Sequence, residues 1–222
     1  MKKTVSIILT ILMVFSFTAC SNSKTEESDT TARTTTSAQA EQNESNPAST
    51  SKTLVVYFSR TGENYSVGNI EKGNTHIIAD MIADKMNADT FEITTVSKYP
   101  ETYDECTEVA KKEKSENARP EIVGTVENME QYDTVFIGYP IWWSDMPLAV
   151  YTFLEAYDFS GKTIIPFCTH EGSGISGTPS NIQTVCPNAK VITDGFEIKG
   201  RIAQNSQDEA KAEVEDWLAD IK

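Results

Sequence analysis

Polar residues that can bind an anion cluster between positions 59 and 75. Residues 59–64 read SRTGEN and follow an apolar run, and residues 73–75 read GNT where a helical pattern begins. Hydroxyls, amides and free backbone N–H groups at a helix N-terminus bind phosphate groups. The segment lacks both the lysine of GxxxxGK[ST] and a GxGxxG pattern, so it predicts neither a P-loop NTPase nor a dinucleotide site. Capping of the helix by Asn74 or Thr75 is the purely structural alternative.

Two adjacent tryptophans, Trp142 and Trp143, lie within residues 140–147, which read PIWWSDMP. Large aromatic rings can form the wall of a site for a planar heteroaromatic ligand. The alternative is that both rings belong to the core, with Asp145 and Pro147 starting the next helix. Because adjacent side chains diverge, we expect one tryptophan to pack inward and the other to lie beside a ligand.

A third polar segment, residues 169–174, reads THEGSG. Its glycines allow the backbone to approach a ligand closely. A flexible turn, with His170 at the surface, is the alternative. We expect three acids, Glu63, Asp145 and Glu171, to lie in or beside the site and to place negative charge near its ligand.

Alternating strand and helix patterns determine where these three segments lie. Apolar runs indicate strands at 54–58, 134–138 and 163–167, with weaker candidates at 91–96 and 190–193. Apolar stripes indicate helices at 77–86, 148–154 and 210–221. The alternation predicts an α/β fold with a doubly wound, five-stranded parallel sheet. The three polar segments follow the first, third and fourth strands, at the carboxyl edge where such sheets bind ligands.

The first 52 residues differ in composition from the rest. Residues 1–19 combine Lys2 and Lys3 with an apolar run, which predicts a signal peptide. The run ends FTAC at Cys20, which resembles the lipobox of bacterial lipoproteins; an ordinary secretory signal is the alternative. Residues 20–52 are rich in Ser and Thr and contain no Leu, Ile, Val or aromatic residue, so we expect a lipidated Cys20 followed by a disordered tether. Residues 53–222 have the size of one domain.

Charge and cysteine content exclude other classes of protein. The chain carries 19 basic and 33 acidic residues, a net charge of −14, which argues against nucleic-acid binding. Two histidines and four scattered cysteines show no metal-ligand spacing, so we expect no metal site. We expect Cys168 to pack in a buried strand, Cys106 to lie on a solvated helix at 104–116, and Cys186 to be free or bonded to Cys168. A thiol redox centre is the alternative.

Taken together, the motifs resemble the flavodoxin family. They are YFSRTGEN at 57–64, the displaced GNT at 73–75, YPETY at 99–103, PIWW at 140–143 and FCTHEGSG at 167–174. The resemblance covers about residues 53–200 and implies the strand order 2-1-3-4-5 and bound FMN. It places the FMN phosphate at Ser59, Thr61, Asn74 and Thr75. The sequence departs from the family pattern in that residues 65–73 intervene between SRTGEN and GNT.

The resemblance implies a protein that binds FMN non-covalently and transfers electrons. The apolar run ending FTAC at Cys20 adds the expectation that it is lipid-anchored outside the cytoplasm. An FMN-dependent NAD(P)H:quinone-type oxidoreductase and a surface binding module with an empty pocket are the alternatives. The expected partners are a redox protein or a small electron acceptor, and the membrane through the lipid anchor; no side chain need act catalytically. The expected cofactor-binding residues are Ser59, Arg60, Thr61, Asn64, Asn74, Thr75, Pro140, Ile141, Trp142, Trp143, Thr169, Glu171, Gly172 and Ser173.

Overall fold

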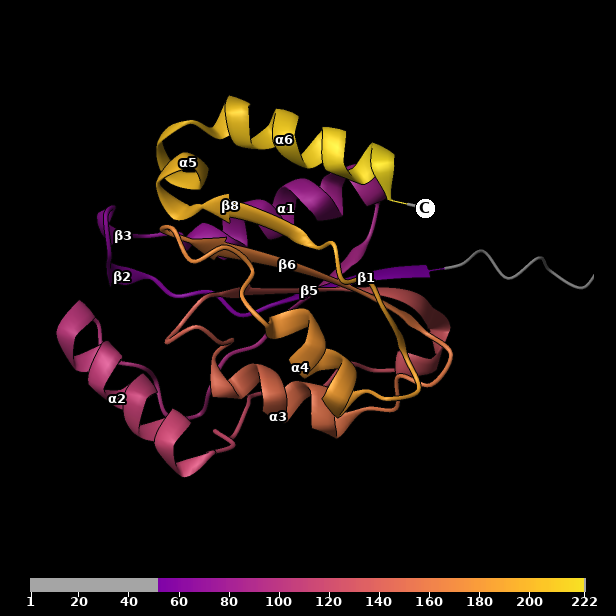
Figure 1. The fold of residues 1–222 in the computed structure, drawn as a ribbon, viewed down its shortest axis with the longest axis horizontal. Coiled ribbons are helices and arrows are strands. Elements are labelled where there is room, and N and C mark those ends of the chain that lie inside the picture. The colour runs from indigo at the N-terminus through magenta and orange to yellow at the C-terminus, as the bar shows by residue number, and fades with distance from the viewer. Residues whose placement is uncertain (1–51, 222) are drawn as a thin grey trace, which may run out of the picture. The chain divides into compact units, whose positions relative to one another are not determined.

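Residues 52–221 form an α/β domain in which helices cover both faces of a central sheet (Figure 1). This computed structural model describes those residues. The predicted signal peptide, Cys20 and nearly all of the predicted tether lie outside the described residues. Within the described range, no helix combines the length and the apolar composition needed to cross a membrane.

The parallel sheet confirms the predicted topology. Its strands are β1 (Lys52–Tyr57), β4 (Asp89–Glu92), β5 (Tyr132–Pro140), β6 (Thr163–His170), β7 (Lys190–Val191) and β8 (Phe196–Lys199). The order is β4-β1-β5-β6-β7, with β8 also pairing with β6. Because β7 and β8 pair with successive parts of β6, they are two halves of one interrupted fifth strand. Counted along the chain, the order is therefore 2-1-3-4-5.

Two predicted strands are only partly correct. The strand expected at 91–96 ends at Glu92, and beyond it Thr95 makes an isolated antiparallel bridge to Ile122. The strand expected at 190–193 is only the first half of the fifth strand, because the chain leaves β6 after Val191 and returns at Phe196.

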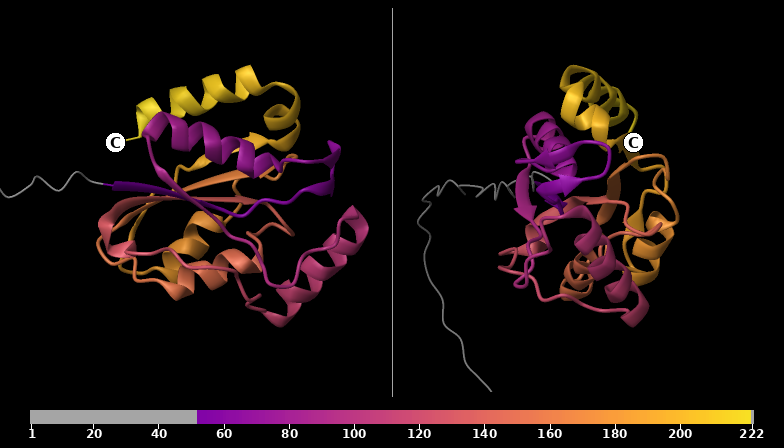
Figure 2. Two further views of the ribbon diagram at one scale, coloured as in Figure 1. Left: turned by 180° about the vertical axis from the view of Figure 1, so that it is seen from behind. Right: turned by 90° about the vertical axis from the view of Figure 1, so that its left-hand side faces the viewer.

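The helices form a layer on each face of the sheet. They are α1 (Asn74–Met86), α2 (Tyr103–Glu116), α3 (Leu148–Ala156), α4 (Thr178–Val185), α5 (Gly200–Asn205) and α6 (Gln207–Asp220), with a 3₁₀ turn η1 (Met129–Gln131). Figures 1 and 2 show α1, α5 and α6 on one face and α3 and α4 on the other. Helix α2 lies toward the carboxyl end of the strands, at the same end of the sheet as β2 and β3.

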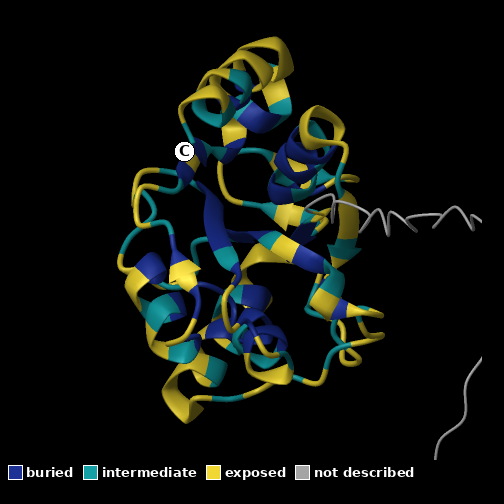
Figure 3. Cartoon of the chain, turned by 90° about the vertical axis from the view of Figure 1, so that its right-hand side faces the viewer, coloured by how far each residue is buried: buried dark blue, intermediate teal, exposed yellow. Residues whose placement is uncertain are grey.

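The strand sequence produces two cores because successive side chains point to opposite faces. Leu54 and Val56 of β1 belong to the core that includes α3, whereas Val55 and Tyr57 belong to the core that includes α1 and α6. The interior strands are accordingly buried along most of their length (Figure 3). This burial on both faces explains why strands β1, β5 and β6 are apolar runs rather than alternating ones.

Residues between the first strand and α1 form a feature that the sequence did not predict. Strands β2 (Gly62–Asn64) and β3 (Gly68–Ile70) pair as an antiparallel hairpin. The three-residue strands are too short and too polar for a period-two pattern. The hairpin contains most of the insertion that separates SRTGEN from GNT.

Candidate functional site

A cleft of about 270 Å³ opens at the carboxyl edge of the sheet, where the three polar segments converge. Nine predicted residues line it: Arg60, Asn64, Asn74, Pro140, Ile141, Trp142, Trp143, Thr169 and Glu171. Five predicted residues lie outside its lining: Ser59, Thr61, Thr75, Gly172 and Ser173. Six further residues complete it: Tyr65, Tyr103, Cys106, Thr107, Ala110 and His170. The structure therefore brings most of the predicted set together and adds a wall formed by α2.

The start of α1 presents two free backbone N–H groups. Ser59 Oγ accepts a hydrogen bond from the N–H of His76 at 3.1 Å, and the carbonyl of Gly73 accepts from Ile77. Within residues 52–221, the N–H groups of Asn74 and Thr75 have no protein acceptor and Gly73 provides no side-chain cap. The positive end of the helix dipole adds to these donors, so this terminus can bind an anion.

Gly73 allows α1 and the segment at residues 59–60 to approach closely. A Cβ atom there would lie 2.2 Å from Ser59 Oγ and 2.6 Å from the carbonyl oxygen of Arg60. Real Cβ atoms do not approach other atoms so closely, so glycine is required at this position. Its role is steric, since its φ of −68° is open to any residue.

Thr75 connects α1 to the end of β6. Its hydroxyl lies 2.8 Å from the hydroxyl of Thr169, and both residues are buried, with 1% and 3% exposure. The side chain of Thr75 thus has a protein partner. Its contribution to an anion site comes from its backbone N–H.

Within residues 52–221, two buried oxygen atoms at the edge of the cleft accept no hydrogen bond. In the described part of the chain, Asn74 Oδ1 and Glu171 Oε2 are buried without a hydrogen-bond partner. Glu171 Oε1 accepts from the N–H of Arg201 at 2.8 Å, and its Oε2 lies 3.6 Å from Arg201 Nη1. A buried acceptor without a hydrogen bond costs free energy, and the Arg201 ion pair offsets this only for Glu171, so Asn74 Oδ1 above all favours a ligand that brings hydrogen-bond donors.

The tryptophans are held by a tight turn. Trp142 and Asp145 exchange backbone hydrogen bonds of 2.8 and 3.0 Å around Trp143 and Ser144, whose φ angles are 51° and 61°. Two left-handed central residues are characteristic of a type I′ turn. The left-handed backbone conformation costs a non-glycine residue roughly 1–2 kcal/mol of conformational free energy. The turn therefore places Trp143 at the cleft at the expense of local strain.

One tryptophan packs inward, as expected, and the other is exposed. Trp142 packs edge-to-face on Phe58 and Tyr99, with ring centroids 5.3 and 5.1 Å away. Trp143 is 49% exposed, and its Nε1 donates to the carbonyl of Thr107 in α2. Trp142 thus belongs to the aromatic core beneath the cleft, and Trp143 offers an accessible ring at its mouth.

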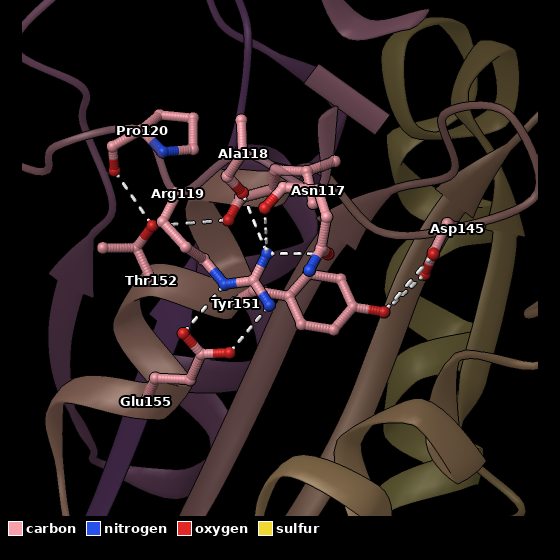
Figure 4. A network of polar contacts seen from close by, with 9 residues as sticks. Asn117, Ala118, Arg119, Pro120, Asp145, Tyr151, Thr152 and Glu155 are labelled. Carbon is pink, nitrogen blue, oxygen red and sulfur yellow. Dashed lines mark hydrogen bonds and ion pairs between the residues drawn. The ribbon is translucent and has the colours of Figure 1, made fainter. Parts of the chain in front are cut away.

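Asp145 supports this turn; it lies next to the cleft-lining Trp142 and Trp143 but is not itself in the lining. Its carboxylate accepts hydrogen bonds from Tyr151 at 3.1 Å and from Asn181 at 3.0 Å. Arg119 packs over the Tyr151 ring and makes two bonds of 2.8 Å to Glu155 (Figure 4). This pairing raises the pKa of Arg119 and lowers that of Glu155. The network joins the end of α2 to α3 and to the tryptophan turn.

Glu63 is also outside the cleft lining. One of its carboxylate oxygens accepts from the N–H of Tyr103 at 3.0 Å, at the start of α2. Of the three acids expected in or beside the site, only Glu171 lines the cleft, and its carboxylate is held by Arg201.

His170, which the alternative reading placed at the surface of a flexible turn, organises the third loop. Its Nδ1 accepts hydrogen bonds from the N–H groups of Gly172 at 2.8 Å and Gly174 at 3.3 Å. This arrangement places the proton of the neutral imidazole on Nε2. The N–H groups of Gly172 and Gly174 are therefore already bonded to His170, and the imidazole ring itself lines the cleft.

The cysteines carry no disulfide within residues 52–221: Cys106, Cys168 and Cys186 are free and buried. Burial raises the pKa of Cys186 to about 11 and raises that of Cys168 still further. Cys168 packs in its strand, as predicted. The helix predicted at 104–116 is confirmed, but Cys106 is buried on its cleft side instead of solvated, and burial raises its pKa against the opposing charge of Arg60.

Tyr65 and Tyr103 are lining residues that sequence reasoning did not assign. Each belongs to a segment already noted, the insertion after SRTGEN and the YPETY motif. Their exposure in the structure, 62% and 37%, is the feature that distinguishes them from core tyrosines. Nothing in the local pattern indicates that these two distant segments meet.

A parallel sheet of order 2-1-3-4-5, with free amides at a helix N-terminus and an aromatic cleft at its carboxyl edge, defines a flavodoxin-like protein. Residues 52–220 match the family model described as Flavodoxin. The chain therefore belongs to the flavodoxin family.

Solved structures agree with this assignment. A protein from Bacteroides uniformis, described as a candidate flavoprotein, is 31% identical, with a TM-score of 0.60 over 74% of this chain and 98% of its own. A similarly described protein from Bacteroides eggerthii is 28% identical, with a TM-score of 0.57 over 72% and 98%. A flavoprotein from Lactobacillus acidophilus, solved in complex with FMN, shares the fold at 19% identity, with a TM-score of 0.51 over 70% and 97%. No curated protein matched the sequence.

Proposed function

We propose that this domain binds FMN non-covalently and transfers electrons to a redox partner protein or a small acceptor. The observation that carries the proposal is the pair of free amides at the start of α1, beside a cleft that exposes Trp143. An anion site next to an accessible aromatic ring suits a ligand with a phosphate at one end and a planar ring at the other. Membership of the flavodoxin family and the FMN complex of a structural relative support this choice.

The residues present fit each part of FMN. The amides of Asn74 and Thr75 would hold the phosphate. Asn74 Oδ1 and Glu171 Oε2, which accept no hydrogen bond from the described residues, would accept them from ribityl hydroxyls. Trp143 would contact the ring. When bound, FMN supplies the redox chemistry, accepting and donating electrons through its ring. The protein positions the cofactor and excludes water from part of it.

FMN binding is tested with the purified full-length chain. We expect the protein to be yellow as isolated or to bind added FMN with quenching of flavin fluorescence. Riboflavin, which lacks the phosphate, should bind at least about tenfold more weakly, since one hydrogen bond to a charged group contributes ~1.5–3 kcal/mol. Colourless protein that leaves FMN fluorescence unchanged would contradict the proposal and favour a binding module with an empty pocket.

We further propose that the domain is tethered by a lipid on Cys20 to the outer side of the cytoplasmic membrane. The basic start, the apolar run and the Ala19-Cys20 pair support this localisation. Cys20→Ser should move the protein from the membrane fraction to the medium, or stop its processing. A mature-sized variant that still sediments with membranes would be the contrary result.

A further inference from the structure

Arg60 contacts main-chain carbonyls of two separate segments. Its Nε and Nη2 donate to the carbonyl of Pro100 at 3.2 and 2.6 Å, and Nη2 also reaches those of Glu101 and Thr102 at 2.6 and 3.0 Å. Its Nη1 donates to the carbonyl of Glu63 in β2. All three guanidinium nitrogens are thus engaged by the protein, although the residue follows Ser59 in the segment expected to bind phosphate.

Further contacts join the same two segments. The N–H of Glu63 donates to the carbonyl of Glu101 at 2.8 Å, and the Glu63 carboxylate accepts from the N–H of Tyr103 at 3.0 Å. Gly62 lies against this segment so closely that a Cβ atom would be 2.8 Å from the Glu101 carbonyl oxygen. The hairpin is therefore docked on the residues that lead into α2, with Arg60 at the junction.

This junction builds the outer side of the cleft. It brings Tyr65 of the hairpin against Tyr103, the first residue of α2, with ring centroids 5.9 Å apart. Tyr103, Cys106 and Thr107 follow one another on the α2 face that lines the cleft. Thr107 in turn accepts from the Trp143 indole through its carbonyl, so the wall is continuous from the hairpin to the tryptophan turn.

We propose that Arg60 is a positioning residue that assembles the outer wall of the cofactor cleft by fastening the β2–β3 hairpin to the start of α2. The tests that measure flavin binding rest on the proposed function. This positioning role differs from the alternative, in which the Arg60 guanidinium binds the FMN phosphate directly. A fastening role affects every ligand of the cleft, whereas a phosphate contact affects only ligands that carry a phosphate.

The two roles are separated with Arg60→Gln and Arg60→Lys in the full-length protein. We expect the affinities for FMN and riboflavin to fall together, each by about tenfold or more, because several bonds from a charged donor are lost. Arg60→Lys should resemble Arg60→Gln, since a single ammonium group cannot reach carbonyls on both sides as a planar guanidinium does. If FMN affinity alone falls and lysine restores it, Arg60 contacts the phosphate and the proposal is overturned.

A pair of glycine variants tests the same junction without changing charge. Gly62 and Gly68 lie in the same hairpin with similar φ angles of 78° and 73°, so alanine strains the backbone equally at both. Only the Cβ atom at Gly62 meets Glu101; at Gly68 no atom of the described residues lies within 4 Å. Gly62→Ala should therefore weaken binding of both flavins, and Gly68→Ala should not. Equal effects of the two variants would contradict the proposal.

Hydrogen exchange of the flavin-free protein makes this test independent of the proposed function. In Arg60→Gln, amides of residues 62–70 and 102–107 should exchange at least about tenfold faster, while those of β1 and α1 stay protected, because only the local junction opens. Uniform loss of protection would indicate general destabilisation, and unchanged exchange would show that Arg60 does not hold the junction. Either result overturns the proposal even if FMN binds normally. If FMN does not bind at all, the exchange result still decides the role of Arg60.

Discussion

Gly73→Ala is expected to lower the affinity for FMN by at least about a hundredfold, since each hydrogen bond to a charged group contributes ~1.5–3 kcal/mol and tenfold in affinity corresponds to ~1.4 kcal/mol. The added Cβ atom would overlap Ser59 Oγ and the backbone of Arg60. Relief of that overlap moves the start of α1 away from the end of β1. The amides of Asn74 and Thr75 then no longer face the place where the phosphate lies.

Fluorescence titration with FMN and riboflavin measures this effect. Riboflavin affinity should fall much less, because riboflavin has no phosphate for the helix terminus to bind. Gly177→Ala is the matched control: Gly177 occupies the same cap position at α4, and no atom of the described residues lies within 4 Å of an added Cβ atom. An unchanged FMN affinity in Gly73→Ala would mean that the phosphate lies elsewhere in the cleft.

Gly138→Ala is expected to destabilise the domain by about 3 kcal/mol, at the upper end of the usual cost of overpacking a core. Gly138 lies in the second half of β5, and an added Cβ atom would be 2.0 Å from Cζ of Phe167 on the neighbouring strand. Phe167 is fully buried between the sheet and the α1–α6 layer, so its ring cannot move aside without displacing other core residues. Urea denaturation at neutral pH measures the loss in free energy of unfolding.

Phe167→Leu in the same background tests the mechanism. The smaller side chain makes room for the Cβ atom, so the double variant should be more stable than Gly138→Ala alone. Phe167→Leu by itself should destabilise the protein, because it leaves a cavity where the ring was. If the two losses simply add, the residues do not interact and the steric explanation is wrong.

The sheet and the location of the cleft were predictable from the sequence. Buried runs such as 54–58 and 163–167 indicate central parallel strands, because only strands covered on both faces are continuously apolar. Once those strands are placed, the segments that follow them must meet at the carboxyl edge. The division of Trp142 and Trp143 between core and surface likewise follows from the opposite directions of neighbouring side chains.

The partners of individual polar groups were decided by the tertiary structure alone. Arg60 was predicted only as one of the cofactor-binding residues, and the structure shows its guanidinium donating to main-chain carbonyls 40 to 42 residues away. Glu171 was predicted to place a negative charge near the ligand, and the structure shows its carboxylate accepting a hydrogen bond from the N–H of Arg201. The local sequence shows which groups can donate or accept a hydrogen bond and which face of a helix or strand they occupy. The choice among partners depends on which distant segments the packing brings within about 3 Å, a distance at which hydrogen bonds form.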